Sequence, residues 1–483
     1  MTQARITANG FREYDGRWRY PEEINPAGAE ALGNGLGKLM LESGAAPQIV
    51  LGRDLRSYSD AIAESLASGL VRAGIRVFDI GTVISPMAYF ARPHLGIDAV
   101  AMVTASHNPN GWTGLKAGLR HPHTLNGGQM RRLRQIVLQE AVHCRPGGER
   151  LGRTPVDAPY LDDLCGDFRL RRSLKIVCAT GNGTAGLFAP EFLRRIGARI
   201  VHLHTETDVR FPHYNPNPES LEMLSDMARN TCSSGADLAF GFDGDGDRLG
   251  IIDNEGNMVF ADKIGLLLAR SFAETHPNPR FIADIKSTGL YASDPLLMAR
   301  GAATEYWKTG HSHIKHRLFE TGALAAFEKS GHFYFGPPIG RGYDDALLAA
   351  REVCRLLDQF PGKSLSELVA ELPESWTTPT MSPYCSDEDK YDVAGRITRT
   401  LIDMRDQGER IAGLPIREIV TVNGARCILE NGSWVLVRAS SNTPNLVVVC
   451  ESMDSEAEMS AIFADIDRLL RREPEVGEYD QRI

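Results

Sequence analysis

Three aspartates, Asp243, Asp245 and Asp247, alternate with glycines in the segment DGDGDR, which ends in Arg248. Glycine lets the backbone turn tightly, so that three carboxylates can face one hard cation such as Mg²⁺. Clustered like charges repel one another unless a cation neutralises them. A calcium-binding EF-hand would need glycine at the position of Arg248 and glutamate at that of Asn254. The spacing therefore predicts a magnesium site, with Arg248 available to an anionic ligand.

A serine follows an apolar segment in the run TASHNP, residues 104–109. The segment 98–104 is typical of a strand, and ligands collect beyond the carboxyl ends of strands in α/β sheets. The Asn-Pro pair favours a turn that exposes Ser106. Side chains next to each other on an extended backbone point apart, so no dyad with His107 is expected. The loop predicts either an exposed nucleophile or a plain Asn-Pro turn.

Two further polar segments, EKSGH at 328–332 and RASSNTP at 438–444, contain groups that bind sugars and phosphates. Glu328 and Ser330 together offer acceptors and a donor for adjacent sugar hydroxyls. Arg438 and the hydroxyl groups after it could surround a phosphate with charge-assisted hydrogen bonds. Taken alone, the composition of 328–332 favours an exposed turn after a helix, and 438–444 is also typical of a common polar connection between strands.

The run GNGTAG at 181–186 lies between an apolar segment and a helical pattern, and Glu206 follows it. A dinucleotide-binding fingerprint has such glycines, with an acidic residue about twenty positions further on. A nicotinamide-dependent oxidoreductase is therefore an alternative. That alternative leaves Ser106 and the aspartates without a role, and a tight glycine-rich turn from strand to helix accounts for the pattern as well.

The composition limits the class of protein. With 483 residues the chain is too long for one compact core, which favours three or four domains. A formal net charge of −9 without a Lys/Arg run argues against a nucleic-acid partner. The apolar runs are too short to span a bilayer and no signal-peptide pattern begins the sequence, so we expect a cytoplasmic protein without a membrane partner. The eight cysteines lack CxxC spacing, which favours free thiols.

Short apolar strands alternate with helical patterns over most of the chain, which indicates α/β units. Three rounds are recognisable, and their first strands are expected at 46–52, 174–179 and 281–285. A helix is expected over 185–196. The residues after 383 predict a small sheet with helices on one face, an α+β unit. The stretch 374–383 predicts a linker and hinge, and the charged tail from Glu473 is expected to fray.

The loops TASHNP, DGDGDR, EKSGH and RASSNTP stand in the order, and at about the spacing, of the phosphoserine, metal, sugar and phosphate loops of the α-D-phosphohexomutase superfamily. The chain resembles that superfamily over essentially its whole length, and FREYD at 11–15 resembles its opening motif. WKTGHS at 307–312 and the Arg-Ala-Ser loop are similar to the phosphomannomutase/phosphoglucomutase branch. The chain departs from the family pattern around Arg17, at Thr113 and at Ser441-Asn442, which bears on substrate preference.

The resemblance implies an α/β fold of four domains around a central cleft, three α/β domains with mixed sheets and a smaller C-terminal α+β domain. The expected domains are 1–155 with the phosphoserine loop, 156–257 with the metal loop, 258–373 with the sugar loop and 374–483 with the phosphate loop. The implied activity is an isomerase that interconverts hexose 1-phosphate and hexose 6-phosphate, of mannose or glucose, through a phosphoserine and a 1,6-bisphosphate. The bisphosphate would also serve as activator. Sugar phosphates would be the partners of a monomer or small homo-oligomer.

The resemblance also assigns roles to individual residues. The ligands of Mg²⁺ would be Ser106, Asp243, Asp245 and Asp247. Catalysis would involve Ser106, Lys116, Arg248, His311 and Arg17, with Lys116 or His311 as the proton carrier. The substrate would contact Tyr14, His107, Lys286, Glu328, Ser330, His332, Arg438, Ser440, Ser441, Asn442 and Thr443.

Three related functions remain open at this point. A phosphoglucosamine mutase would use the same loops on an amino sugar, although that branch usually carries a DGDADR-like metal loop. A metal-dependent sugar phosphatase would release free phosphate without isomerisation. A non-catalytic sugar-phosphate binder is disfavoured because Ser106 and the three aspartates are present.

Overall fold

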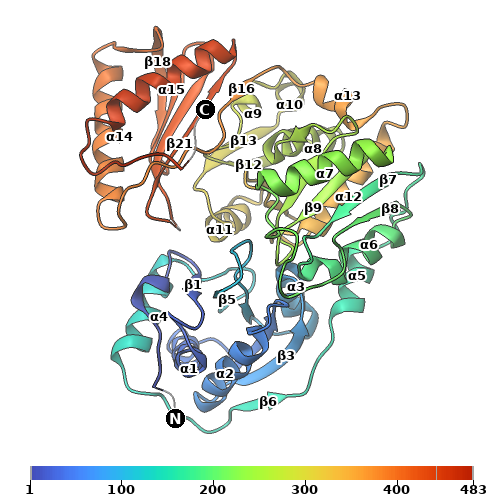
Figure 1. Cartoon of the computed structure of the whole chain (residues 1–483), viewed down its shortest axis with the longest axis vertical. Coiled ribbons are helices and arrows are strands. Elements are labelled where there is room, and N and C mark those ends of the chain that lie inside the picture. Colours follow the sequence, from blue (N-terminus) through green and yellow to red (C-terminus); the bar gives the residue numbers. More distant parts are fainter. Residues whose placement is uncertain (1–2, 442, 481–483) are drawn as a thin grey trace. The chain divides into compact units, whose positions relative to one another are not determined.

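The computed structural model describes residues 3–441 and 443–480, and the chain forms two compact units. The first unit comprises Met1–Ser271 and Lys315–Val369, and the second comprises Phe272–Ile314 and Ala370–Ile483. Each unit is therefore assembled from two separate stretches of the chain, whose elements are shown in Figure 1. The chain passes between the units within α8 (Ala261–Thr275), α11 (His311–Thr321) and α13 (Leu365–Ala370).

A six-stranded mixed sheet, in the order β1-β5-β4-β2-β3-β6, begins the first unit. Its strands are β1 (Gly16–Arg19), β2 (Gln48–Arg53), β3 (Arg76–Thr82), β4 (Ala99–Val103), β5 (Trp112–Gly118) and β6 (Glu149–Leu151). Helices α1 (Pro26–Glu42), α2 (Ser59–Arg72) and α4 (Gly127–Gln139) share one apolar core with this sheet, while α3 (Ser85–Leu95) contacts β2 and β4 (Figure 1). The Ser106 loop follows the carboxyl end of β4, as the sequence predicts.

A second mixed sheet, in the order β11-β10-β9-β7-β8, belongs to the same unit. Its strands are β7 (Lys175–Ala179), β8 (Arg199–Leu203), β9 (Leu238–Phe242), β10 (Leu249–Ile252) and β11 (Met258–Val259). The helices of this region are α5 (Asp157–Cys165), α6 (Ala189–Arg195) and α7 (Leu221–Ser234). The aspartate loop joins β9 to the antiparallel β10.

The helix expected over 185–196 is not continuous. A short 3₁₀ turn, Thr184–Leu187, is followed by a break at Phe188 and then by α6. Pro190 stands at the start of α6. Proline has no N–H to donate and its ring clashes with the carbonyl four residues earlier, so it disfavours a continuous helix here and is tolerated at the first turn of a new one.

The remaining part of the first unit carries the sugar-type loop. Strands β14 (Ala325–Phe327) and β15 (Phe333–Phe335) form an antiparallel pair, and residues 328–332 connect them. Helix α12 (Ala346–Gln359) contacts β15 and the strand β10 that follows the aspartate loop. The sequence-predicted metal and sugar segments therefore lie in one compact unit.

The second unit contains a parallel strand pair and a separate antiparallel sheet. The pair is β12 (Arg280–Asp284) and β13 (Ala303–Trp307), with the short helices α9 (Leu290–Ser293) and α10 (Pro295–Ala299). The sheet, in the order β16-β21-β20-β19-β18-β17, consists of β16 (Trp376–Thr377), β17 (Arg410–Ile411), β18 (Leu414–Val420), β19 (Ala425–Leu429), β20 (Trp434–Ala439) and β21 (Leu446–Ser452). Helices α14 (Lys390–Asp406) and α15 (Glu456–Leu470) cover one face of it (Figure 1). Together with the mixed sheets, this arrangement confirms the predicted fold class.

Two sequence-based expectations about the C-terminal region are wrong. The stretch 374–383 is not a free linker, because β16 pairs with β21 and Met381 bridges to Val448. The tail after Glu473 does not fray before the end of the described residues, because the backbone of Tyr384 is hydrogen-bonded to Gly477 and Glu478. Both segments owe their order to pairing with residues far away in the sequence, which a local pattern does not reveal.

The C-terminal sheet is joined to the loop after β12 by a buried polar network. Arg426 is 1% exposed, and its Nη1 donates to the carbonyl oxygens of Ile285 and Ser287 at 2.8 and 2.7 Å. Its guanidinium lies between the rings of Tyr306 and Trp434, 4.1 and 3.7 Å from their centroids. A planar cation therefore fills the space between two aromatic rings and satisfies two buried carbonyls.

Replacing Arg426 with methionine should destabilise the second unit. The substitution leaves two buried carbonyls without this donor, and we expect the free energy of unfolding to fall by about 3 kcal/mol. Urea denaturation followed by tryptophan fluorescence measures the change. Arg417→Met removes an exposed arginine from β18 of the same sheet and should change the stability by less than about 0.5 kcal/mol. Equal losses in both variants would contradict the assigned role of Arg426.

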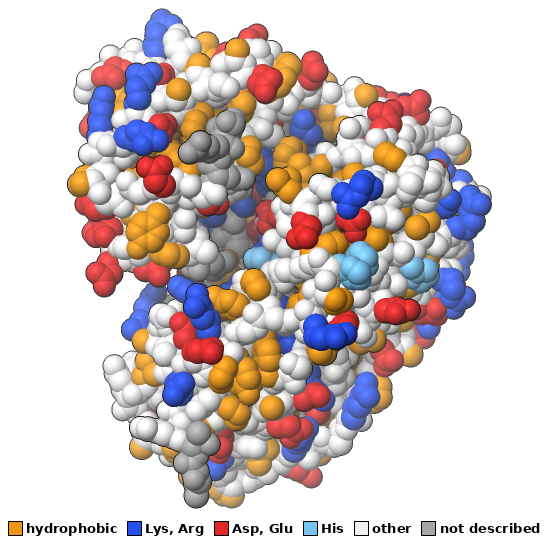
Figure 2. Space-filling model, in the orientation of Figure 1, with side chains coloured by type: hydrophobic (Ala, Val, Ile, Leu, Met, Phe, Trp, Pro, Cys, Tyr) orange, Lys and Arg blue, Asp and Glu red, His pale blue; other side chains and the backbone are white. Residues whose placement is uncertain are grey.

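Among residues 3–441 and 443–480, no helix has the length and apolar character needed to cross a bilayer. On the face drawn in Figure 2, basic and acidic side chains are interspersed rather than gathered by sign. All eight cysteines are free thiols.

Candidate active site

The two glycines of the aspartate loop are required by the space around them. A Cβ on Gly244 would lie 2.5 Å from the carbonyl oxygen of Ser106. A Cβ on Gly246, whose φ is +71°, would lie 2.8 Å from Ile84 Cγ2. Only glycine fits both positions without a shift of the neighbours. The resulting tight turn brings one carboxylate oxygen from each of the three aspartates within 4.8 Å of the others.

Asp243 is the aspartate that connects this loop to the serine. It is fully buried, and its Oδ1 accepts hydrogen bonds from the backbone N–H groups of Asp247 and Arg248 at 3.1 and 3.2 Å. Its Oδ2 accepts one from the hydroxyl of Ser106 at 3.0 Å. Burial, followed by the charges of Asp247 and Asp245, raises the pKa of Asp243 well above its usual value.

Lys116 on β5 supplies the positive charge nearest to the other two aspartates. Its Nζ donates to Asp245 Oδ2 at 2.7 Å and also to Asp247 Oδ2. Ser85, at the start of α3, donates to the same oxygen of Asp245 at 2.7 Å. Burial acts to lower the pKa of Lys116, but Asp245 and Asp247 outweigh it and raise the pKa well above its usual value. The lysine is therefore a buried cation.

The carboxylates fit a divalent cation. Asp245 Oδ1 and Asp247 Oδ1 are buried and have no hydrogen-bond partner among the described residues. Buried carboxylate oxygens without partners cost free energy, and hard cations such as Mg²⁺ take oxygen ligands. The donor set and the unsatisfied oxygens together make this acidic group suitable for a metal ion.

Ser106 differs from the sequence-based expectation in two respects. It is 2% exposed, so the Asn-Pro turn does not expose it. Its hydroxyl lies 3.2 Å from His107 Nδ1, although the two side chains were expected to point apart. That expectation assumed an extended backbone, whereas Ser106 has a φ of 52°, and a left-handed turn can bring adjacent side chains together. Burial, followed by the charges of Arg248 and Arg17, lowers the pKa of His107 well below its usual value.

Arg56 and Asp54 hold the serine loop, and sequence reasoning missed both. Arg56 donates from Nη2 to the carbonyl oxygens of Ser106 and Asn108 at 2.9 and 2.6 Å. Its Nη1 is paired with Asp54, and both side chains are 1% exposed. The backbone N–H of Ala105 donates to the same carboxylate at 3.2 Å. The signal was available, because Asp54 and Arg56 lie within three residues after the end of an apolar strand.

The glycine-rich run 181–186 supports the site rather than a nucleotide. Residues 180–185 are all buried, and a Cβ on Gly183 would lie 3.0 Å from the carbonyl oxygen of Thr180. The backbone N–H of Thr184 donates to the carbonyl of Gly244 in the aspartate loop at 3.2 Å. The Thr184 hydroxyl accepts from the N–H of Leu55 at 3.2 Å. The pattern reflects a packed turn, so the dinucleotide alternative loses its only support.

Tyr14 and Arg17 come from the first strand region of the same unit. Arg17 on β1 donates from Nε and Nη2 to Asp15 Oδ2 at 3.0 and 2.9 Å. Tyr14 is buried, and burial, followed by the charges of Asp15 and Glu328, raises its pKa well above the usual value. Glu328 therefore lies near enough to Tyr14 for its charge to raise the pKa of Tyr14, although the two residues are far apart in sequence.

Glu328 and Ser330 are adjacent in the connection between β14 and β15. Ser330 donates to Glu328 Oε2 at 3.4 Å, and the hydroxyl of Tyr334 donates to Oε1 at 2.7 Å. Both loop residues are buried, which excludes the exposed turn that their composition also allowed. Tyr334, which sequence reasoning missed, fixes the carboxylate of Glu328.

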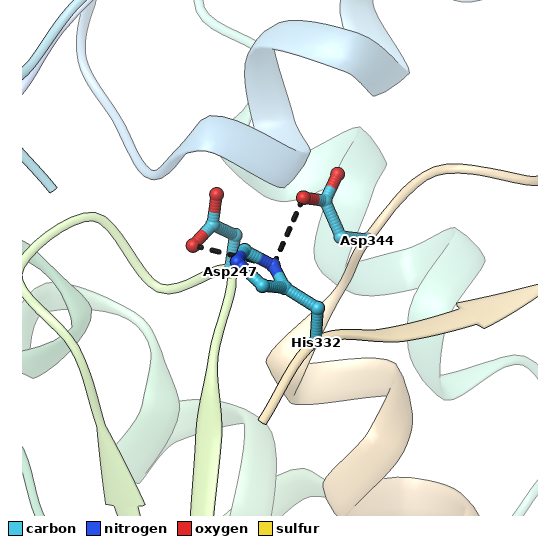
Figure 3. A group of neighbouring side chains, drawn as sticks. All are labelled: Asp247, His332 and Asp344. Atoms are coloured by element: carbon cyan, nitrogen blue, oxygen red, sulfur yellow. Dashed lines mark ion pairs between the residues drawn. The ribbon is translucent and has the colours of Figure 1, made fainter. Parts of the chain in front are cut away.

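Arg248 and His332 meet at the end of the aspartate loop. Arg248 donates from Nε to His332 Nε2 at 3.0 Å and from Nη1 to Glu219 Oε2 at 2.8 Å. His332 also lies beside Asp344 and Asp247, as Figure 3 shows, with its Nδ1 3.1 and 3.8 Å from their carboxylate oxygens. The first unit thus brings together a set of sequence-predicted residues: Tyr14, Arg17, Ser106, His107, Lys116, Asp243, Asp245, Asp247, Arg248, Glu328, Ser330 and His332.

The remaining predicted residues belong to the second unit. Lys286 and His311 are both buried and follow β12 and β13. Asp284 ties their loops together, because Ser287 donates to its Oδ1 at 2.5 Å and Thr309 to its Oδ2 at 2.9 Å. The loop after β12 and the loop after β13 are therefore both hydrogen-bonded to the buried carboxylate of Asp284.

The phosphate-type loop of the second unit connects β20 to β21. Arg438 and Ser440 are buried, and the hydroxyls of Ser440 and Thr443 lie 2.8 Å apart. The buried Lys390 donates to the carbonyl of Thr443 at 2.9 Å. Ser441 is partly exposed in the same loop, and Asn442 lies outside the described residues.

A buried serine hydroxyl beside a lysine and three carboxylates that suit a divalent cation defines a phosphoryl-transfer type of α/β protein. Profiles of the phosphoglucomutase/phosphomannomutase domains match residues 8–142 (alpha/beta/alpha domain I), 158–256 (domain II), 260–376 (domain III) and 401–469 (C-terminal domain). The chain therefore belongs to the phosphoglucomutase/phosphomannomutase family.

Relatives of known name are similar over nearly the whole chain. A phosphomannomutase/phosphoglucomutase of Pseudomonas putida is 34% identical over 99% of this chain and 98% of its own. A phosphoglucomutase of Neisseria gonorrhoeae is 31% identical over 95% and 96%. A solved structure of a family protein from Burkholderia thailandensis has a TM-score of 0.86 and 30% identity, covering 98% of this chain and 99% of its own. The resemblance drawn from the four loops is confirmed.

Replacing Arg56 should loosen the serine loop. Arg56→Met leaves the buried carboxylate of Asp54 without its cation, and we expect the free energy of unfolding to fall by about 3–5 kcal/mol. Arg56→Lys keeps the charge but not the planar fork, so an intermediate loss is expected. Urea denaturation followed by circular dichroism measures both. The exposed Arg120 provides the control, since Arg120→Met should shift the stability by less than about 0.5 kcal/mol. A stable Arg56→Met protein would contradict this account.

Proposed function

We propose that this member of the family interconverts hexose 1-phosphate and hexose 6-phosphate, of glucose and mannose, with Ser106 as the phosphoryl carrier. The observation that carries the proposal is the buried Ser106 hydroxyl, 3.0 Å from Asp243, at the aspartate loop. A serine in this position can hold a phosphoryl group beside a bound cation. The names of the relatives from Pseudomonas and Neisseria support the same substrate class.

Mg²⁺, held by Asp243, Asp245, Asp247 and the phosphorylated Ser106, would offset the charge of the transferring phosphoryl group. Lys116 adds a second positive charge at Asp245 and Asp247. Arg248, Arg17, Tyr14 and His107 would bind and orient the reacting end of the sugar, together with Lys286 and His332. Lys116 and His311 are the two candidates for the proton carrier, and Lys116, a buried cation beside Asp245 and Asp247, would have to lose its own proton before it could accept one.

The substrate is proposed to bind by groups that both of its orientations share. Its resting phosphate would contact Arg438, Ser440, Ser441, Asn442 and Thr443. Glu328 and Ser330 would accept and donate hydrogen bonds at O3 and O4 of the ring. Ser106 would pass its phosphoryl group to the free hydroxyl of the sugar, and the hydroxyl proton would leave to the proton carrier. The 1,6-bisphosphate would turn over and return its other phosphoryl group to Ser106.

Dual sugar specificity follows from this mode of binding. Glucose and mannose differ only in the configuration at C2, and the contacts proposed here lie on the phosphate, O3 and O4. The side chains assigned to the ring do not read O2, so both sugars satisfy the same hydrogen bonds. A hexose 1,6-bisphosphate would restore phosphoserine whenever the intermediate escapes, which accounts for its expected role as activator.

Removing the Ser106 hydroxyl should abolish the activity. For Ser106→Ala we expect conversion of glucose 1-phosphate or mannose 1-phosphate to fall by about three orders of magnitude or more. Phosphorus NMR with Mg²⁺ and a trace of glucose 1,6-bisphosphate follows the conversion. Intact-mass measurement of the wild-type protein should reveal one phosphoryl group that the variant lacks. Release of inorganic phosphate without isomerisation would point to a phosphatase, and activity only on glucosamine phosphates would point to that mutase.

Metal removal should stop the reaction reversibly. Chelation by EDTA is expected to eliminate conversion, because three adjacent buried carboxylates then repel the incoming phosphate. Adding Mg²⁺ should restore it. Asp245→Asn and Asp247→Asn should each raise the Mg²⁺ concentration needed for half-maximal activity, whereas Asp208→Asn, on the surface of the same domain, should not. Full activity in the chelated protein would refute the assignment of this metal site.

A further inference from the structure

A line of buried side chains runs away from the aspartate loop. Lys315 Nζ donates to Asp344 Oδ1 at 2.7 Å, and Asp344 Oδ2 lies 3.1 Å from His332 Nδ1. Arg248 Nε donates to the other ring nitrogen, His332 Nε2, at 3.0 Å. Figure 3 shows the histidine between Asp344 and the metal-loop residue Asp247. Lys315 and Asp344 have no exposed surface, so the pair is shielded from water.

The contacts determine which ring nitrogen of His332 carries the proton. An arginine in a protein is always protonated, so its Nε–H can only donate. His332 Nε2 must therefore accept, and the proton of the neutral ring is on Nδ1. Nδ1 lies 3.1 Å from Asp344 Oδ2, a close ion-pair contact rather than an aligned hydrogen bond, and the negative charge of that carboxylate favours a proton on this nitrogen. Lys315 compensates the charge of Asp344 from the other side, so the carboxylate remains available as an acceptor.

The orientation of Arg248 depends on this tautomer. Its Nε donates a hydrogen bond to His332 Nε2, and its Nη1 donates one to Glu219 Oε2 at 2.8 Å. Two acceptors at different nitrogens fix the plane of the rigid guanidinium fork. If the proton of His332 moved to Nε2, two N–H groups would face each other and Arg248 would lose one of its two supports.

We infer that Lys315 and Asp344 are positioning residues for phosphoryl transfer, because this buried ion pair holds His332 in its Nδ1–H tautomer and thereby holds Arg248 in the orientation that receives the anionic substrate. The inference rests on the proposed function only for the role of Arg248. The tautomer and its cause rest on the contacts alone.

Asp344→Asn is the sharpest single change. Lys315 needs an acceptor, so the new amide oxygen turns to Lys315 and its NH₂ group faces His332. The histidine must then accept at Nδ1 and carry its proton on Nε2, against Arg248. We expect kcat/KM to fall about 10- to 100-fold, as for other residues that orient a site through a histidine.

A second substitution should reverse the effect. In the double variant Lys315→Met, Asp344→Asn, the amide is released from the ammonium and can turn its oxygen to His332 Nδ1. The Nδ1–H tautomer and most of kcat/KM should return. A pair that only stabilised the core would give no such recovery of kcat/KM in the folded protein.

The tautomer is measured directly in full-length protein labelled with ¹⁵N-histidine, using the long-range ¹H–¹⁵N spectrum. The signals of His332 are those absent from His332→Gln. Wild type should display Nδ1–H, Asp344→Asn should display Nε2–H, and the double variant should return to Nδ1–H. The matched control is Asp345→Asn. That carboxylate is buried next in sequence and caps α12 through the N–H of Leu348 at 3.0 Å. Asparagine also caps helices, so tautomer and kcat/KM should be unchanged.

The outcomes separate this inference from the proposed function. An Nε2–H tautomer in wild type overturns it, whether or not any variant folds. Wild-type kcat/KM in folded Asp344→Asn also overturns it. A wild-type protein without mutase activity, but with the expected tautomer shifts, would refute the proposed function and leave the positioning of Arg248 intact.

Discussion

Asp243, Asp245 and Asp247 are fully buried beside one another, and the free energy of that arrangement constrains the residues around them. Like charges away from water need compensation from fixed donors and cations. The donors come from two sheets: the aspartate loop follows β9, while Lys116, Ser85 and the Ser106 hydroxyl belong to the first domain. Neither domain contains a complete set, so the electrostatic requirement of the loop also holds the two domains together at the site.

At three places in the chain, a buried arginine donates hydrogen bonds to two separate groups and fixes them relative to each other. Arg56 binds two carbonyls of the serine loop, and Arg426 binds two carbonyls after β12. Arg248 binds an imidazole and a carboxylate. In each case a rigid, permanently charged fork fixes irregular backbone or another side chain at two points, which a flexible ammonium would do less well. The loops that carry candidate site residues are thereby fixed by hydrogen bonds to buried side chains.

Much of the fold was predictable because alternating strands and helices leave periodic patterns. The metal loop was predictable because carboxylates crowded together by glycines repel one another unless they share a cation. The helix expected over 185–196 was wrong because the local signal of Pro190 was overlooked. The other wrong predictions treated local sequence as local structure. The left-handed backbone of Ser106, the pairing of β16 with β21 and the contacts of the tail all depend on distant residues. Tyr334 and Asp344 were missed for the same reason, since their partners become neighbours only after folding, whereas Arg56 was overlooked although its place after an apolar strand was a usable signal.

The interleaved order of the two units bears on how the chain is made. The first unit needs Lys315–Val369, which is synthesised after part of the second unit has left the ribosome. Synthesis proceeds at about 5–20 residues per second. Residues Met1–Ser271 are therefore made several seconds before the β14–β15 hairpin and helix α12, which complete the first unit. During that interval the aspartate loop lacks His332 and its neighbours. Completion of the first unit is thus a late event in biogenesis, and a nascent chain stalled before residue 369 would expose an unfinished domain.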